Sequence, residues 1–141
     1  AEVLFLAAFL QEMGKILIAS EVIQNDETIS FASEIENSNN LSVVERAYSN
    51  VTSAEVTAMI FEYWGFDTDF VEMIRHSDDP SFALSEVKEY ATALNIVKTI
   101  VPINKPFSEM SINFGLKIAS DALYDTALLE ESILQIMSFK E

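Results

Sequence analysis

The side chains able to do chemistry in this chain include a single histidine and no cysteine. The absence of cysteine excludes disulfides, thiolate nucleophiles and metal sites built on cysteine. One imidazole, His76, cannot supply a metal site made mainly of histidines. Acidic residues are dense between Asp67 and Asp79, but they lack the glycine and the ligand spacing of a calcium loop. This acidic segment is therefore interpreted as helix caps and a solvated face.

Common catalytic and binding motifs are also missing. The three glycines are too scattered to form a phosphate-binding loop, and there is no His-Glu-x-x-His pattern or nucleophile elbow. Acidic residues outnumber basic ones by 23 to 8, which gives a formal net charge of −15. Such a surface repels phosphate backbones and anionic lipids, so we expect neither nucleic acid nor a membrane as a partner.

The elements that must position these side chains are predicted to be helices. A chain of 141 residues that is 50% hydrophobic fits one domain with a substantial core, and three glycines and three prolines are too few for a small all-β fold. Apolar residues recur at helical spacing, so we predict an all-α bundle of about seven to eight helices in a single domain over residues 1–141. The predicted helices cover residues 3–18, 28–36, from 42 onward, 52–65, 67–76, 84–101, 108–123 and 126–139.

The N-terminal segment is strongly apolar and superficially resembles a signal peptide. It has no basic region at its start, and Gln11, Glu12 and Lys15 interrupt it well before a membrane span of about 20 residues is reached. We therefore predict a helix buried among others. Its abrupt apolar start suggests a piece of a longer chain, and exposed apolar surface left by a missing covering part would favour self-association.

Two of the predicted helices begin with capping-box spacing, Ser42 to Glu45 and Thr52 to Glu55. The second one carries an apolar stripe at positions i, i+3, i+4, i+7 and i+8, made of Val56, Met59, Ile60, Tyr63 and Trp64. The helix predicted over residues 84–101 carries another stripe, made of Val87, Ala91, Leu94 and Val101. Lys98 interrupts this second stripe.

Two segments resemble the HDOD domain, an HD-related output domain of bacterial signalling proteins. The first is the apolar helix from Phe5 to Leu17 with its Gly-Lys step, which is similar to the signature helix of the HD superfamily. The second runs from Val51 through Tyr63-Trp64-Gly65-Phe66 to the His-x-x-x-Pro of residues 76–80. The resemblance implies that the chain is the C-terminal portion of an HDOD-type domain whose N-terminal helical lobe is absent.

The departures from the family pattern decide the predicted activity. In metal-binding HD phosphohydrolases, a His-Asp doublet, further histidines and a late Asp hold the metals that activate water. The resemblance places five other residues at those positions: Gln11, Glu12, Ser53, Ser77 and Lys98. A neutral amide, a hydroxyl and an ammonium cannot build a divalent site, so the sequence predicts no enzyme, no metal and no cofactor. His76 is interpreted as a helix-end histidine.

Lys98 and Glu12 each interrupt an apolar helix face, and each could neutralise the other. In metal-binding relatives the corresponding residues reach the same ion. We therefore predict a buried or half-buried ion pair between Glu12 and Lys98 where the metal of the family would lie. The pair would be expected to show non-additive effects when both residues are replaced.

These observations predict a non-catalytic, cytoplasmic module of bacterial signal transduction that acts by binding another signalling protein. The alternative is an HD-class metal-dependent phosphohydrolase or cyclic-dinucleotide phosphodiesterase, which needs the missing ligands. A third possibility is a plain helical scaffold whose resemblance is only structural. The sequence does not identify the partner, the signal or any small ligand.

Overall fold

A computed structural model describes residues 2–139, and over those residues it contains nine α-helices, one 3-10 turn and no strand. The prediction of an all-α fold is confirmed. Most predicted boundaries lie within a few residues of the observed ones. The helices are α1 (Glu2–Leu10), α2 (Gly14–Gln24), α3 (Thr28–Asn37), α4 (Leu41–Ser49), α5 (Ser53–Tyr63), α6 (Thr68–Arg75), α7 (Ser85–Ile100), α8 (Glu109–Asp121) and α9 (Thr126–Ser138), with the 3-10 turn at Pro80–Phe82.

The chain divides into two compact units, Ala1–Asn95 and Ile96–Glu141, and α7 contributes residues to both. The prediction of one domain stays a prediction, and each unit is described by itself. The first unit holds α1 to α6 and the greater part of α7. The second unit holds the end of α7 and the helices α8 and α9.

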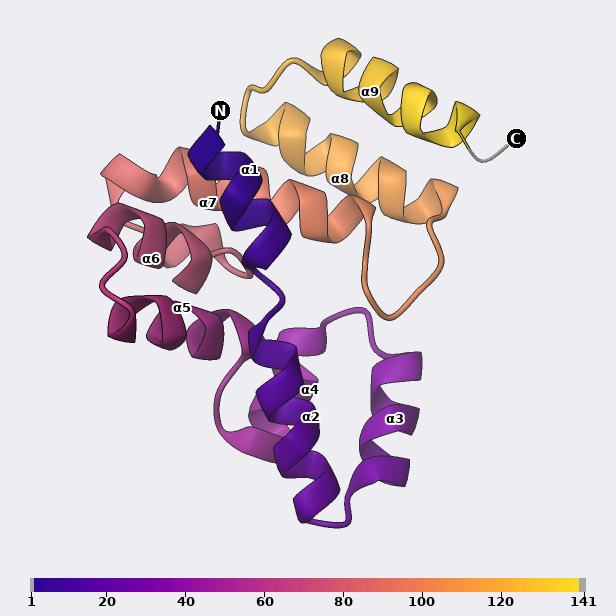
Figure 1. Cartoon of the computed structure of the whole chain (residues 1–141). Helices are drawn as coiled ribbons and strands as arrows, with labels where there is room; N and C mark the ends of the chain where they lie inside the picture. Colours follow the sequence, from indigo (N-terminus) through magenta and orange to yellow (C-terminus); the bar gives the residue numbers. More distant parts are fainter. Residues whose placement is uncertain (1, 140–141) are drawn as a thin grey trace. The chain divides into compact units, whose positions relative to one another are not determined.

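The core of the first unit lies where α5 and α6 pack side by side (Figure 1). Phe61 of α5 makes edge-on ring contacts with Phe66 and Phe70, at centroid distances of 4.7 and 5.3 Å. Such aromatic pairs contribute beyond the apolar area that they bury. The buried members of this core are Ala7, Ala58, Phe61, Phe70, Val71, Met73, Ile74, Val87 and Leu94.

The buried face of α5 differs from the predicted one. The structure buries Ala54, Thr57, Ala58 and Phe61, whereas Tyr63 is 88% exposed and Trp64 is 57% exposed. The predicted stripe was wrong because the face that packs against neighbouring helices consists of small residues and Phe61, whereas Tyr63 and Trp64 lie on the exposed side. The predicted capping box at Thr52 and Glu55 is confirmed. The box predicted at Ser42 is wrong, because Asn40 caps α4 and accepts from the backbone N–H of Val43.

The predicted N-terminal helix over residues 3–18 is divided into α1 and α2 by a turn at residues 11–13 (Figure 1). The prediction of a helix buried among others is wrong for α1. Ala7 is its one buried residue, while Phe5 and Phe9 are 75% and 76% exposed. By length and apolar composition alone, the stretch Glu2–Gln24 could cross a membrane, a test that core helices of water-soluble proteins also pass. In the structure this stretch is interrupted by the turn.

The second unit is a helical hairpin, α8 and α9, packed with the end of α7. Its buried core consists of Ile96, Ile100, Ala119 and Ile133. The stripe predicted along the seventh helix is confirmed at Val87, Ala91 and Leu94 but is wrong at Val101, which is exposed. The buried positions change to Ile96 and Ile100 because the last turns of α7 serve the core of the second unit.

Candidate functional site

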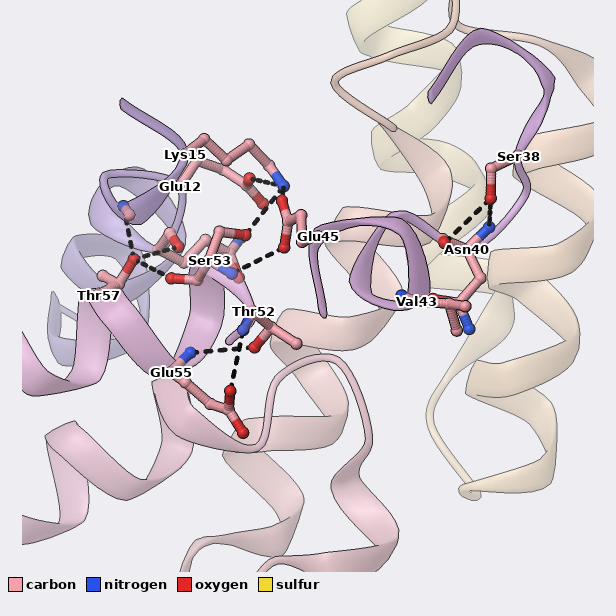
Figure 2. A network of polar contacts seen from close by, with 12 residues as sticks. Glu12, Lys15, Ser38, Asn40, Val43, Glu45, Thr52, Ser53, Glu55 and Thr57 are labelled. Atoms are coloured by element: carbon pink, nitrogen blue, oxygen red, sulfur yellow. Dashed lines mark hydrogen bonds and ion pairs between the residues drawn. The ribbon is translucent and has the colours of Figure 1, made fainter. Parts of the chain in front are cut away.

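The positions singled out in the sequence gather partly around a buried polar cluster in the first unit (Figure 2). At its centre is the ammonium of Lys15, on the first turn of α2. Its Nζ atom lies 3.1 Å from Oε2 of Glu12 and 2.8 Å from Oε1 of Glu45, and it donates to Oγ of Ser53 at 3.0 Å. One ammonium therefore contacts two carboxylates at the junction of α2, α4 and α5.

Glu45 of α4 is 3% exposed, and both of its carboxylate oxygens are engaged. Oε1 accepts from Lys15, and Oε2 accepts from the backbone N–H of Ser53 at 2.7 Å. That N–H is one of the free donors at the start of α5, where a negative charge is favoured by the helix dipole. The carboxylate thus joins α4 to the N-terminus of α5 through charge-assisted hydrogen bonds.

Thr57 of α5 stabilises the turn between α1 and α2. Its Oγ1 accepts from the backbone N–H of Gly14 at 2.8 Å, and it lies within hydrogen-bond reach of the carbonyls of Gln11 (3.1 Å) and Ser53 (2.6 Å). In an uninterrupted helix, the N–H of Gly14 would donate four residues back along its own chain. The hydroxyl replaces that bond, so the contact between the helices holds the turn.

Gly14 allows α2 to approach α5 closely enough for these bonds. A Cβ at this position would overlap the backbone carbonyl oxygen of Ser53 and crowd Oγ1 of Thr57. The pattern Gly14-Lys15 therefore has two physical roles at adjacent positions. The glycine permits the close contact, and the lysine forms ion pairs with the carboxylates around it.

The pKa of Lys15 results from two opposing effects. Burial lowers the pKa because it penalises the charged form, but Glu12 and Glu45 raise it by charge attraction and hydrogen bonding. The net effect is a pKa above the ordinary value of 10.5. The ammonium is therefore retained throughout the physiological range of pH.

Gln11 and Ser53 lie at this cluster, as the sequence comparison implied that they would share one pocket. Gln11 is 2% exposed, and its amide donates to the carbonyl of Ala8 at 3.2 Å. Among residues 2–139, no donor reaches its Oε1 atom. Ser53, with 1% exposure, contributes its hydroxyl and backbone N–H to Lys15 and Glu45.

His76 and Ser77 lie at the end of α6. His76 is the C-cap residue, and its Nε2 atom is 3.3 Å from Oε2 of Glu72, while Oε1 of Glu72 accepts from Arg75 at 2.9 Å. Ser77 is fully buried, and the amide of Asn95 donates to its carbonyl at 2.9 Å. The bond from Asn95 joins the end of α6 to α7 within the first unit.

A family model of the HDOD domain matches residues 1–80. The chain belongs to the HDOD family. The match covers both resembling segments, and it removes the possibility that the resemblance is only structural. None of the curated proteins compared with the chain matches it.

A solved structure, described as a virulence factor from Campylobacter jejuni subsp. jejuni, has a similar fold. The TM-score is 0.68 at 21% sequence identity, and the match covers 86% of this HDOD chain. The chain spans about half of that protein, 47% of its length. At this identity, the likeness establishes the fold alone.

The predicted pair of Glu12 and Lys98 is not tested by these contacts. Glu12 lies in the first unit and already contacts Lys15, while the half-buried Lys98 belongs to the second unit. The pair stays a prediction. A double-mutant cycle of Glu12→Gln and Lys98→Met would measure the coupling between the two residues.

The donors of this HDOD chain do not form an evident metal centre. Across residues 2–139, no group of three or more His, Asp or Glu side chains is placed to hold a metal ion. The two carboxylates nearest to Gln11 and Ser53 are those of Glu12 and Glu45, and both are within ion-pair distance of Lys15. The residues present at the cluster therefore do not fit a divalent cation.

Sequence reasoning missed Glu45, Thr57 and the central role of Lys15. Glu45 was assigned to a capping box because its spacing from Ser42 fits one, yet it bonds to Ser53 eight positions later. The sequence did contain a signal for this contact. Lys15 lies in one apolar stretch, and the oppositely charged Glu45 follows Val44 in another. Such residues need a partner when they are buried.

Proposed function

We propose that this chain is a non-catalytic regulatory module of bacterial signal transduction, located in the cytoplasm, that acts by binding another signalling protein. Membership of the HDOD family supports a regulatory module related to the HD superfamily. We further propose that the module has no catalytic activity and that it acts through protein binding.

The observation that carries the proposal is the occupation of the buried cluster by an ammonium. Lys15 lies between Glu12 and Glu45 at ion-pair distances, where a divalent cation would have to compete with a positive charge that the two carboxylates stabilise. The amide of Gln11 and the hydroxyl of Ser53 are weak ligands for such a cation. The cluster joins α2, α4 and α5 to one another. A structural role of this kind supports a module that binds another protein through its surface.

The alternative function is an HD-class phosphohydrolase or cyclic-dinucleotide phosphodiesterase. It requires a metal that polarises a phosphate ester and activates water. His76 is the one imidazole available, and it contacts Glu72 at the end of α6. A catalytic zinc site typically has three protein ligands, and the chain does not bring three together among the residues that the structure describes.

The experiment measures bound metal and hydrolysis on the same preparation. The purified chain is loaded with magnesium, manganese or ferrous ion, analysed for retained metal, and assayed with cyclic di-GMP and a nucleoside monophosphate. We expect no stoichiometric metal and no turnover above that of buffer. Metal-dependent turnover that is abolished by His76→Ala would contradict the proposal. His76→Ala also has to retain the helical circular dichroism of the parent for that comparison.

A further inference from the structure

The second unit contains an apolar groove that the preceding sections do not use. It lies between the N-terminal end of α8 and the C-terminal half of α9 and has a volume of about 370 Å³. That volume is within the range of ligand pockets, about 300–1,000 Å³. Its lining residues are Phe107, Ser108, Glu109, Ile112, Glu130, Ile133, Leu134 and Met137.

The walls of the groove are open to solvent and adaptable. Leu134 is 66% exposed and Met137 is 44% exposed, although both are large apolar side chains on a helix. Methionine is flexible and polarizable, and it is common at surfaces that bind apolar partners. The hydroxyl of Ser108 is already used, because it accepts from the backbone N–H of Ser111 at 3.2 Å as the cap of α8. The groove thus offers apolar contact with few free polar groups to orient a small molecule.

Two carboxylates line the groove, and no basic side chain among residues 2–139 does. Glu109 and Glu130 form no ion pair with any other residue in the described part of the chain. A partner that combines an apolar face with basic flanks would complement this groove in shape and in charge.

We infer that the groove between α8 and α9 binds a basic amphipathic helix of a partner protein. Apolar side chains at helical spacing enter between Ile112, Leu134 and Met137, and lysines or arginines beside them contact Glu109 and Glu130. Recognition of this kind uses a few apolar anchors at positions i, i+3, i+4 and i+7. The inference rests on the proposed protein-binding function and names the surface and the partner class for it.

The test uses a fluorescein-labelled helical peptide of roughly 18 residues, composed of leucines on one face and lysines elsewhere. The same peptide with glutamate in place of lysine is the charge control. We expect the chain to bind the lysine peptide and not the glutamate peptide. The double variant Leu134→Ala with Met137→Ala should weaken binding about tenfold or more, since anchor residues dominate such interfaces.

The chain offers matched controls on the same helix. Leu128 is 62% exposed on α9 and does not line the groove, so Leu128→Ala should leave binding unchanged. Glu131 is an exposed neighbour of Glu130 that also lies outside the lining. Glu130→Gln together with Glu109→Gln should weaken binding several-fold and reduce its salt dependence, whereas Glu131→Gln should do neither.

Three results would overturn the inference. The first is equal binding of both peptides, and the second is an equal loss of binding in the groove and control variants. The third is a dimer of the chain, detected by light scattering, that dissociates with Leu134→Ala while the peptide fails to bind, because the occupant is then a second copy. None of these results measures metal-dependent turnover. The failure of this inference can therefore be distinguished from the failure of the proposed function.

Discussion

Two helix contacts, one in each unit, are of different kinds. In the first unit, α2 meets α4 and α5 through charged and hydroxyl groups: Lys15 contacts Glu45 and Ser53, and the backbone of Gly14 contacts Thr57. In the second unit, the end of α7 meets α8 through Ile100, which lies against Gly115, and the core there is entirely apolar. The first contact is mainly directional, whereas the second is mainly apolar and includes one hydrogen bond, from Oγ of Ser111 to the carbonyl of Ile100 at 2.9 Å.

This difference has consequences for what each region can do. A polar contact in a buried place is stable only when each group has its partner, so it fixes one arrangement and tolerates little change. An apolar contact between mobile side chains tolerates rearrangement, and it can leave apolar surface to a partner. The polar junction of the first unit therefore serves as a rigid anchor, and the groove of the second unit is the adaptable surface.

The largest expected effect comes from removing the central cation of the polar junction. Lys15→Met would leave Glu12 and Glu45 facing each other without the ammonium, and breaking a buried pair typically costs about 3–5 kcal/mol. We expect a loss of this order in the free energy of unfolding, measured by urea denaturation with circular dichroism. Lys117→Met, on the exposed surface of α8, should change it by less than about 0.5 kcal/mol.

A second variant separates the loss of charge neutralisation from a loss of packing. Combining Glu45→Gln with Lys15→Met removes the buried negative charge that the first substitution leaves unpaired, so part of the stability should return. An additive loss in the double variant would show that the pair is not coupled. The contrast between a directional and an adaptable contact would then fail.

Much of the fold could be predicted from the sequence, because helical spacing and end signals are local. The start of α5 is indicated by the capping box of Thr52 and Glu55, which are only three positions apart. The turn before Gly14 could not be predicted in this way, because Thr57, more than forty positions away, replaces the missing helical bonds. The same limit applied to the site, where the residue identities predicted that metal ligands are missing but not that Glu45 and Lys15 form an ion pair there.

The second-largest expected effect is a difference in stability between alanine variants of two glycines, each of which lies close to a neighbouring helix. A Cβ at Gly14 meets the backbone of Ser53, which cannot move without shifting α5, whereas a Cβ at Gly115 meets the side chain of Ile100, which can change rotamer. We expect Gly14→Ala to cost about 1–3 kcal/mol or more. Gly115→Ala should cost less, because alanine in a helix interior gains up to about 1 kcal/mol over glycine.

Thermal and urea unfolding of the two alanine variants would check this difference. Binding of the lysine peptide gives an independent readout, since Gly115 lies outside the groove lining and Gly14 belongs to the first unit. Equal losses of stability in the two variants would mean that the apolar contact is as rigid as the polar one.

The smallest expected effect is a dependence of stability on alkaline pH. The pKa of Lys15 is raised in the folded chain above its ordinary value of 10.5, so folding favours the protonated form. A raised pKa contributes stability that is fully present below 10.5 and is lost as the pH rises through the folded value. Between pH 6 and 9, the contribution of this lysine should therefore be constant.

Above pH 10.5, the advantage of the parent chain over Lys15→Met should shrink, because the lysine of the unfolded chain loses its proton there while the folded chain still binds one. Other lysines and tyrosines titrate in the same range, so the quantity to measure is the difference in unfolding free energy between the parent and Lys15→Met at pH 8 and pH 11. A difference that stays constant between the two pH values would show that the stabilisation by Lys15 comes from packing of its aliphatic stem, and the polar junction would then resemble the apolar contact of the second unit.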